Sequence, residues 1–547
     1  MDKADEKNKD QQNNAVKKQE PKVTIAEVLD MARLSQFQEQ FERVGFGPES
    51  DAFQLLYDGD FESRMKDVGL KPGHRARMNR TKQLLHETYL QSKAAAEIIT
   101  DRNKKKRLKE SQQESQQESE PESKQENVGT LDPDVVKMLV SENENTIREG
   151  VTRIRKLLSA ERNPPIQEAI NSRIVPRLIE LLSAADDRVA FEAAWALTNI
   201  VSGTSAHVTA VVEAGAVPQL VELLDSTNDD IADQAIWALG NISGDSTNFR
   251  DCVLDAEALP GIIRKMKNFK TNSSAIRNAT WAVSNLCRGK PPPDFSVVRV
   301  AIPVLAGLLT SKDEEVVVDA CWALSYLSDD NTSDNKKIGA IVKSGVQKDL
   351  VRLLDSKDRG LDRGLVVVPA LRTIGNIVSG NDLQTQSVLD CGVLSRLPPL
   401  LKNDRKVIRK EALWTISNIV AGDRKQIKQT LDNGIITCVL QCMEENHNDK
   451  DILKEAAWVL QNAAAGSDSN MRDYLCKVGC GDALCEIIVS CREDGKLLAI
   501  VLGGIKELPQ LMDQISENQK KSIRNLRNHP NTKVCSLAAE ILGDNAS

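Results

Sequence analysis

From about residue 131 onward, apolar and polar positions recur with a period of just over forty residues. The repeat is most visible in a six-residue block that opens with Trp, continues with small and aliphatic residues, and usually carries Asn four positions after the Trp. Successive blocks are 42, 44, 41, 50, 42 and 44 residues apart. Self-similarity at such a period is typical of a repeat solenoid. The opening residues are Trp195, Trp237, Trp281, Trp322, Arg372, Trp414 and Trp458.

A second marker precedes each Trp by about twenty residues. It combines a small residue, an aliphatic pair and often Pro, as in Gly215-Ala216-Val217-Pro218. Because Gly ends one helix and Pro opens the next at its first turn, the marker predicts a break between two short helices. The equivalent glycines in later repeats are Gly345, Gly392, Gly434 and Gly479.

Each unit of about 42 residues is therefore expected to form two or three short helices. One unit cannot bury its apolar face alone, whereas stacked units form a continuous core. The repeat length matches armadillo or HEAT units rather than the 34-residue helical type. The predicted fold is all-α, a right-handed α-solenoid of about ten repeats over residues 131–547.

A helical projection places the Trp and Asn of each block on one face. With Trp195 at 0°, Asn199 lies at about 40° and Glu192 at about 60°, whereas Leu197 and Ile200 lie on the opposite side. Each Trp could be a core residue, as aromatics at helical spacing usually are. However, the polar neighbours one turn before and after it favour an exposed face. The same triplets recur at Gln234/Trp237/Asn241, Asn278/Trp281/Asn285, Asp319/Trp322/Tyr326, Glu411/Trp414/Asn418 and Glu455/Trp458/Asn462.

An exposed ladder of this kind has a specific chemistry. Rings on neighbouring helices, roughly 10 Å apart, form slots that accept a Lys or Arg stem through apolar and cation–π contacts, about 0.5–2 kcal/mol each. Asn amides can hydrogen-bond both the N–H and the C=O of an extended peptide. Acidic residues at the slot ends favour basic side chains. The predicted ligand is therefore an extended peptide rich in Lys and Arg.

At these residues the sequence resembles importin-α, the armadillo-repeat adaptor of nuclear import. The resemblance covers about residues 131–547 and includes the irregularities, Tyr326 in place of Asn and Arg372 in place of Trp. It implies a major site for nuclear localisation signals at Trp195, Asn199, Gly203, Thr204, Gln234, Trp237, Asn241, Asp245, Asn278, Trp281, Asn285, Asp319, Trp322 and Tyr326. It implies a minor site at Arg372, Asn376, Asp382, Glu411, Trp414, Asn418, Glu455, Trp458 and Asn462.

Two of these residues have specific implied roles. By the resemblance, Asp245 pairs with the most tightly held Lys of the signal. Without it, Asp245 after Gly244 would be interpreted as a loop-forming acid. Arg372 is expected to hold acidic neighbours in place rather than to bind a signal.

The chain also departs from the family pattern. The 50-residue spacing reflects extra residues around 357–364, interpreted as a longer loop without an assigned function. The sequence ends at Asn545-Ala546-Ser547 without the acidic tail common in the family, so docking of an export receptor is not implied.

The amino-terminal part differs in composition. Residues 1–22 are expected to be disordered. Residues 23–98 resemble a sterile-alpha-motif (SAM) domain, a small helical bundle, at Leu34–Phe41 and at Val68–Met78 with its Gly-His-Arg turn. SAM domains mostly bind other SAM domains, so self-association is expected. An unrelated helical extension is the alternative interpretation.

Charge changes sharply in the following linker, residues 99–130. Residues 64–109 hold 14 Lys/Arg and 4 Asp/Glu, whereas residues 110–127 hold one Lys and six Glu in a Gln/Glu/Ser-rich stretch. The basic tract Lys104, Lys105, Lys106 and Arg107 has three interpretations. It is a degenerate importin-β-binding segment that also folds back as an autoinhibitory tract, a localisation signal of the protein itself, or a solvated charge run.

Other function classes have little support in the 547 residues. No apolar run of about 18 residues exists and the amino terminus lacks an apolar signal region, so neither a membrane span nor secretion is expected. The 11 Cys are then expected to be free thiols. The five scattered His and the Cys spacings fit no catalytic centre or metal site, and no cofactor or small-molecule partner is expected.

Two non-enzymatic functions remain open at this point. One is a nuclear import adaptor that binds basic cargo signals, links cargo to importin-β and resides in cytoplasm and nucleus. The other is an armadillo scaffold oligomerised by the SAM-like domain. The Trp/Asn ladder favours the adaptor, because a scaffold groove for acidic partners would need Lys and Arg.

Overall fold

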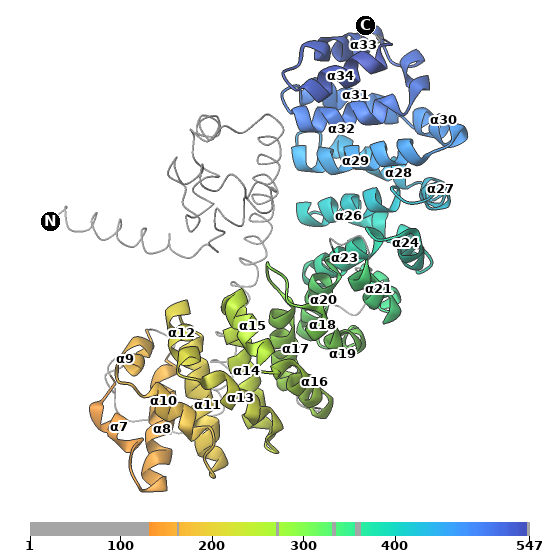
Figure 1. Ribbon diagram of the computed structural model, residues 1–547. Helices are drawn as coiled ribbons and strands as arrows, with labels where there is room; N and C mark the ends of the chain where they lie inside the picture. Colours follow the sequence, from red (N-terminus) through yellow and green to blue (C-terminus); the bar gives the residue numbers. More distant parts are fainter. Residues whose placement is uncertain (1–130, 161–162, 270–272, 331–334, 356–362, 544–547) are drawn as a thin grey trace, which may run out of the picture. The chain divides into compact units, whose positions relative to one another are not determined.

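The computed structural model describes residues 131–160, 163–269, 273–330, 335–355 and 363–543 (Figure 1). Two compact units divide the chain, Met1–Gln125 and Glu126–Ser547, and all described residues belong to the second. The predicted SAM-like domain, the basic tract at 104–107 and most of the extra segment at 357–364 lie outside the described residues.

Each repeat of the described part consists of up to three helices. The first helices are α9 (Ile166–Asn171), α12 (Ser205–Glu213), α15 (Thr247–Asp255), α18 (Phe295–Val298), α21 (Lys336–Lys343), α24 (Asp382–Leu389), α27 (Arg424–Asp432) and α30 (Ser469–Lys477). The second helices are α10 (Val175–Leu181), α13 (Ala216–Glu222), α16 (Ala258–Asn268), α19 (Ile302–Leu308), α22 (Gln347–Leu353), α25 (Leu397–Leu401), α28 (Ile435–Glu445), α31 (Cys480–Ser490) and α33 (Glu517–Asn525).

The third helices are α8 (Glu144–Leu158), α11 (Asp187–Val201), α14 (Asp229–Asp245), α17 (Ser273–Cys287), α20 (Glu314–Ser328), α23 (Arg363–Val378), α26 (Lys406–Ile419), α29 (Lys450–Gly466), α32 (Gly495–Lys506) and α34 (Thr532–Ile541). They include the seven that carry the Trp blocks, α11, α14, α17, α20, α23, α26 and α29. The remaining elements are α7 (Pro133–Met138) and the 3₁₀ turns η2 (Leu223–Asp225), η3 (Arg299–Ala301), η4 (Val393–Ser395), η5 (Pro509–Asp513) and η6 (Leu526–Asn528).

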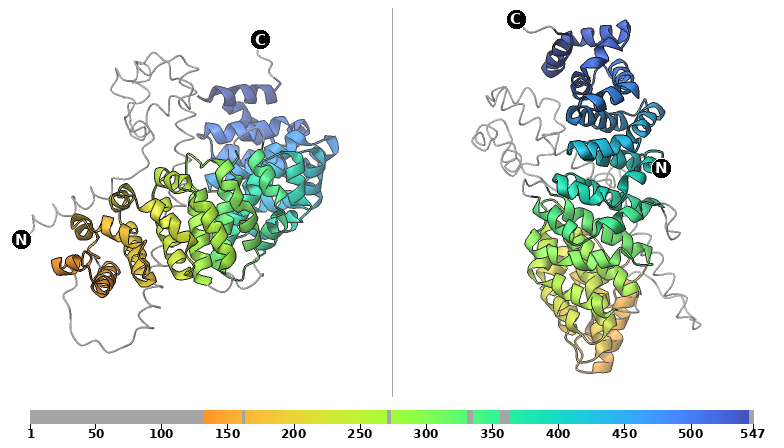
Figure 2. Two further views of the ribbon diagram at one scale, coloured as in Figure 1. Left: turned by 60° about the horizontal axis from the view of Figure 1, so that its bottom comes forward. Right: turned by 90° about the vertical axis from the view of Figure 1, so that its right-hand side faces the viewer.

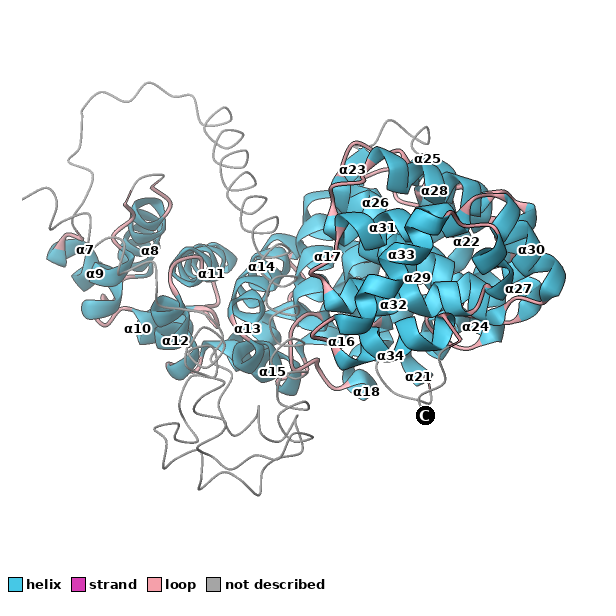
Figure 3. Cartoon of the chain, turned by 90° about the horizontal axis from the view of Figure 1, so that it is seen from above, coloured by secondary structure: helices cyan, strands magenta, loops and turns pink. Residues whose placement is uncertain are grey.

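Third helices follow one another as neighbours along the whole described part. Each one from α8 to α32 packs against the third helix of the next repeat. The colours of Figure 2 show the helical repeats following one another in sequence order. Every regular element among the described residues is helical (Figure 3). The predicted all-α solenoid of armadillo-type units is therefore confirmed.

Glycine breaks between first and second helices occur where the sequence predicts them. Gly215, Gly345, Gly392, Gly434 and Gly479 all have positive φ, between 68° and 95°. This left-handed conformation is strained for residues with a Cβ, which explains why the repeat places Gly there.

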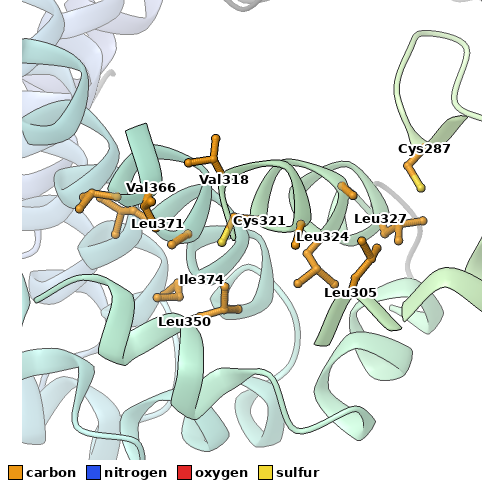
Figure 4. Packing of buried hydrophobic residues seen from close by; sticks show 14 of the residues in the cluster. Cys287, Leu305, Val318, Cys321, Leu324, Leu327, Leu350, Val366, Leu371 and Ile374 are labelled. Atoms are coloured by element: carbon orange, nitrogen blue, oxygen red, sulfur yellow. The ribbon is translucent and has the colours of Figure 1, made fainter. Parts of the chain in front are cut away.

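One apolar core runs through the repeats without interruption. Around α20, the side chains of Val318, Cys321 and Leu324 lie among residues of α19, α22 and α23 (Figure 4). Alanines such as Ala193 and Ala194 are completely buried in the third helices. Their small side chains allow neighbouring helices to approach closely.

Three further expectations concern this part of the chain. None of the described helices is both long and apolar enough to cross a membrane. The cysteines, all within the described residues, are free thiols as predicted. The clustered Cys480 and Cys485 are buried, and burial raises the pKa of both thiols to about 12.

Candidate functional site: the face of the third helices

The six tryptophans lie at the same position of α11, α14, α17, α20, α26 and α29. We call them the tryptophan ladder. Five are half-buried, and Trp458 is 38% exposed, so none is fully enclosed in the core. Each ladder tryptophan therefore packs partly into the core and keeps an accessible edge. The sequence left open either a core position or an exposed one, and the structure lies between the two.

Small residues of the preceding repeat receive the ladder rings. A Cβ added at Gly240 would lie 2.4 Å from the Trp281 ring, and one at Gly375 would lie 2.2 Å from the Trp414 ring. Both glycines stand three residues after the block-opening position of their own repeat. Each of these rings thus rests on the backbone of the neighbouring third helix.

The Asn residues four positions after the ladder connect neighbouring repeats. The Asn285 amide donates to the Gly240 carbonyl at 3.1 Å, and the Asn462 amide donates to the Ser417 carbonyl at 3.0 Å. Asn376 and Asn418 donate in the same way to Ser325 and Gly375, and Asn199 donates to the Ser159 hydroxyl. An amide has two N–H groups and one oxygen, so part of each amide is left for another partner. The sequence interpretation, in which these amides can hydrogen-bond an extended peptide, missed this inter-repeat role.

Asn241 is the exception among these asparagines. Its amide nitrogen is buried and has no hydrogen-bond partner within the described residues. An unsatisfied buried donor costs about 1–3 kcal/mol, so such a group in a native protein calls for an explanation.

The polar positions one turn before the Trp are more enclosed than the exposed face that the projection predicted. Glu192, Gln234, Asn278, Asp319 and Glu411 are all buried, while Glu455 is half-buried. Several are engaged between repeats: Gln234 donates to the Thr198 hydroxyl at 2.8 Å, and Asn278 donates to Asp233 at 3.1 Å. The prediction of an open polar arc is therefore wrong at these five positions. Four of them, Glu192, Gln234, Asn278 and Glu411, contact a neighbouring third helix.

Two arginines stand at the Trp position of repeats that lack Trp. Arg372, expected to hold acidic neighbours in place, donates its guanidinium to Glu411 and lies 5.4 Å from the centre of the Trp414 ring. Arg155 repeats the arrangement: it donates to Glu192 at 2.6 Å and lies 4.1 Å from the centre of the Trp195 ring. Sequence reasoning missed Arg155, although extending the period back by 40 residues from Trp195 would have found it.

Asp245 closes α14, beside the turn that carries Gly203 and Thr204. The Ser205 hydroxyl donates to its carboxylate at 2.7 Å. Burial raises the pKa of Asp245 above its usual value, and the hydrogen bond from Ser205 opposes that shift. Gly203 and Thr204 are exposed. This end of α14 therefore presents a partly desolvated carboxylate next to an accessible turn.

The remaining predicted residues lie along the same helices. Trp322 and Tyr326 stack with ring centres 5.9 Å apart. The Tyr326 hydroxyl is buried without a partner in the described part, and burial raises the pKa of Tyr326 to about 12. Asp382, the first residue of α24, is exposed, and its carbonyl accepts from Gln426 at 2.8 Å.

Comparison with known proteins identifies repeats in the same part of the chain. Residues 162–202, 204–244, 291–329, 381–421 and 423–465 match the Armadillo/beta-catenin-like repeat family. Importin subunit alpha-1b of Oryza sativa subsp. japonica is 39% identical over 430 residues, which cover 75% of this chain and 78% of the relative. The chain belongs to the importin subunit alpha family.

Other members of the importin subunit alpha family match over a shorter range. Importin subunit alpha-3 of Arabidopsis thaliana is 47% identical over 281 residues, 51% of each chain. Importin subunit alpha-B of Dictyostelium discoideum is 50% identical over 251 residues, 46% of this chain and 47% of the relative. This chain thus spans about half the length of these two relatives. A solved structure of an engineered protein covers 75% of this chain and 98% of its own at 28% identity, with a TM-score of 0.67.

Proposed function

We propose that the face of the third helices binds Lys/Arg-rich nuclear localisation signals of cargo proteins and that the chain acts as a nuclear import adaptor. The major site comprises the residues from Trp195 to Tyr326 named above, and the minor site those from Arg372 to Asn462. The role is binding and transport in cytoplasm and nucleus, not catalysis.

One observation carries this proposal. The chain already places a guanidinium over two ladder tryptophans, Arg155 over Trp195 and Arg372 over Trp414, each paired with a buried glutamate. These internal contacts have the chemistry expected of a signal Lys or Arg in the other slots. Cation–π attraction contributes about 0.5–2 kcal/mol per contact of this kind.

Two groups of α14 support the major site in particular. Asn241 has a buried amide donor without a partner, which a peptide carbonyl would satisfy. Asp245, one turn further, is a partly buried carboxylate that a cation would stabilise. Backbone clamping by Asn241 and charge pairing by Asp245 would together hold a basic residue of an extended chain.

Fluorescence anisotropy with a labelled peptide containing one Lys-rich cluster tests the proposal. The full chain is expected to bind this peptide, and a matched peptide with the Lys residues replaced by Ala is expected to lose binding. Equal binding of the two peptides would contradict the assignment. A preference for acidic peptides would favour the scaffold function instead.

Linkage to importin-β is a separate part of the proposal. It rests on the basic tract at 104–107, which lies outside the described residues, and on membership of the importin subunit alpha family. A pull-down of importin-β with residues 64–127 tests it. A fragment with Ala at the four basic positions serves as the control.

A further inference from the structure

His207 performs at the start of α12 the task that glutamine performs elsewhere in the chain. The backbone N–H of Thr204 donates to its Nδ1 at 3.1 Å, within a capping box between Thr204 and His207. At the start of α24, the Asn381 N–H donates to the Gln384 Oε1 at 2.9 Å. At the start of α27, the Asp423 N–H donates to Gln426 in the same way, at 3.3 Å.

The imidazole also occupies the same space as the glutamines. A Cβ added at Gly203 would lie 2.2 Å from the His207 Nδ1. The corresponding distances are 2.1 Å from Gly380 to the Gln384 oxygen and 2.0 Å from Gly422 to the Gln426 oxygen. In all three repeats, a side-chain acceptor therefore covers a glycine and fixes the turn into the first helix.

This turn leads directly into the proposed major site. Gly203 and Thr204 belong to that site, and the next residue, Ser205, donates its hydroxyl to Asp245 at 2.7 Å. If the turn moves, the hydrogen bond from Ser205 to Asp245 moves with it. His207 is thus placed to act on a signal through the turn, without contacting the signal itself.

Imidazole and amide differ in one respect that matters here. An amide oxygen accepts a hydrogen bond at any ordinary pH, whereas Nδ1 accepts only while the ring is neutral. A protonated ring would point an N–H at the Thr204 N–H. It would also place a positive charge in the first turn of α12, where the helix dipole is unfavourable to cations.

The charged groups on the packed elements do not alter this direction. α9 carries Glu168, α13 carries Glu222 and α12 itself carries Glu213. The charged residues of α11 are Asp187, Arg188 and Glu192, and those of α14 are Asp229, Asp230, Asp233 and Asp245. Glu168 accepts from the Leu131 N–H and Glu192 is paired with Arg155. Burial lowers the pKa of His207 below its usual 6.5. The turn with neutral His207 is therefore stable at pH 7 and loses its cap as pH falls through the folded-state pKa of His207, which lies below 6.5.

We propose that His207 is a positioning residue that makes signal binding at the major site depend on pH through its cap, a dependence that the Gln caps beside the minor site do not provide. The proposal rests on the function proposed above. If signal binding requires the intact turn, protonation is expected to weaken binding about five-fold, the size of an ordinary capping interaction.

The test compares the full chain with its His207→Gln variant. Anisotropy with the single-cluster Lys peptide is measured at pH 7.5 and pH 5.5. The unchanged chain is expected to lose about five-fold more affinity between these values than the variant, with equal affinity at pH 7.5. The Asp245 carboxylate is present in both proteins, so its own titration cancels in the comparison. Identical pH profiles would overturn the proposal.

A reciprocal variant and a second readout keep the result decisive. Gln384→His is expected to give the minor site the pH dependence that His207 gives the major one, measured with a two-cluster peptide. The amide resonance of Thr204, followed by NMR in the full chain, is expected to titrate below pH 6.5 and to stop doing so in His207→Gln. If no variant binds any peptide at pH 7.5, the proposed function fails. The Thr204 titration then still decides whether His207 holds the turn, and its absence would contradict that role.

Discussion

The Arg155 guanidinium lies 4.1 Å from the centre of the Trp195 ring. The same guanidinium donates to Glu192, whose side chain is 6% exposed, at 2.6 and 3.3 Å. A side chain of the protein itself, Arg155, therefore covers one face of Trp195, the first residue of the tryptophan ladder. Arg372, Glu411 and Trp414 form the equivalent cluster where the proposed minor site begins.

Arg155→Ala is expected to destabilise the first repeats by about 3–5 kcal/mol, because it leaves the buried Glu192 carboxylate without its partner. Hydrogen exchange of the α8 and α11 amides would report the loss locally. Lys156→Ala removes an exposed neighbouring charge and is the matched control, expected to change stability by less than about 0.5 kcal/mol. Equal exchange in the two variants would contradict a structural role for the pair.

Asp245→Lys is expected to abolish binding of a basic signal peptide at the major site. The substitution removes the proposed partner of a signal Lys and adds a like charge, for an expected loss of about 2–5 kcal/mol. Anisotropy measures the affinity, and circular dichroism checks that the fold is intact. Unchanged affinity in a folded variant would remove Asp245 from the site.

How far the sequence predicts this structure depends on what each residue contacts. The left-handed glycines, such as Gly215 and Gly434, follow from local backbone chemistry, and their positions were predictable. The periodic Trp block also predicted that the Trp-bearing helices of successive repeats lie next to one another. Arg372 was predictable because its departure from the block pattern is visible in the sequence alone.

Contacts between repeats were not predictable in the same way. A helical projection treats each helix as isolated, so it placed Gln234 on an open face that α11 in fact covers through Thr198. It likewise could not show that the Asn285 amide donates to a carbonyl of the preceding repeat, or that Asn241 lacks such a partner. These properties depend on the offset between stacked helices, which no single repeat encodes.

The two proposed sites are expected to respond differently to loss of their tryptophans. Trp195→Ala with Trp237→Ala should strongly weaken peptides with one basic cluster. Trp414→Ala with Trp458→Ala should mainly weaken peptides with two clusters, which need both sites. Anisotropy with both peptide types provides the comparison, and equal effects of the two pairs on both peptides would show that the division into two sites is wrong.

The basic tract at 104–107 is expected to compete with cargo if it folds back. The Gln/Glu/Ser-rich sequence after the tract predicts a flexible tether of about 20 residues with a reach of roughly 25 Å, which would correspond to a millimolar effective concentration. Deleting residues 1–127 should tighten binding of the single-cluster peptide about ten-fold, and Ala at Lys104–Arg107 should reproduce most of that gain. If both variants bind as the full chain does, the solvated-run interpretation of the tract is favoured.

Glu455→Gln is expected to change stability and binding in opposite directions. Burial is the main cause that raises the pKa of Glu455 above its usual 4.5, Glu411 and Asp451 add to it, and Lys410 and Lys454 oppose it. The folded chain then binds more protons than the unfolded chain just above pH 4.5, so stability falls as pH rises through the raised pKa. At pH 7 the variant, which has no charge to desolvate, should unfold at a higher temperature than the unchanged chain. Below pH 4.5, where both forms are neutral at this position, the difference should disappear.

The same substitution should weaken a two-cluster basic peptide at pH 7, because it removes a carboxylate of the proposed minor site. Thermal unfolding at both pH values and anisotropy at pH 7 measure the two effects. A variant that loses stability at pH 7 would contradict this prediction and show that the Glu455 charge stabilises the fold.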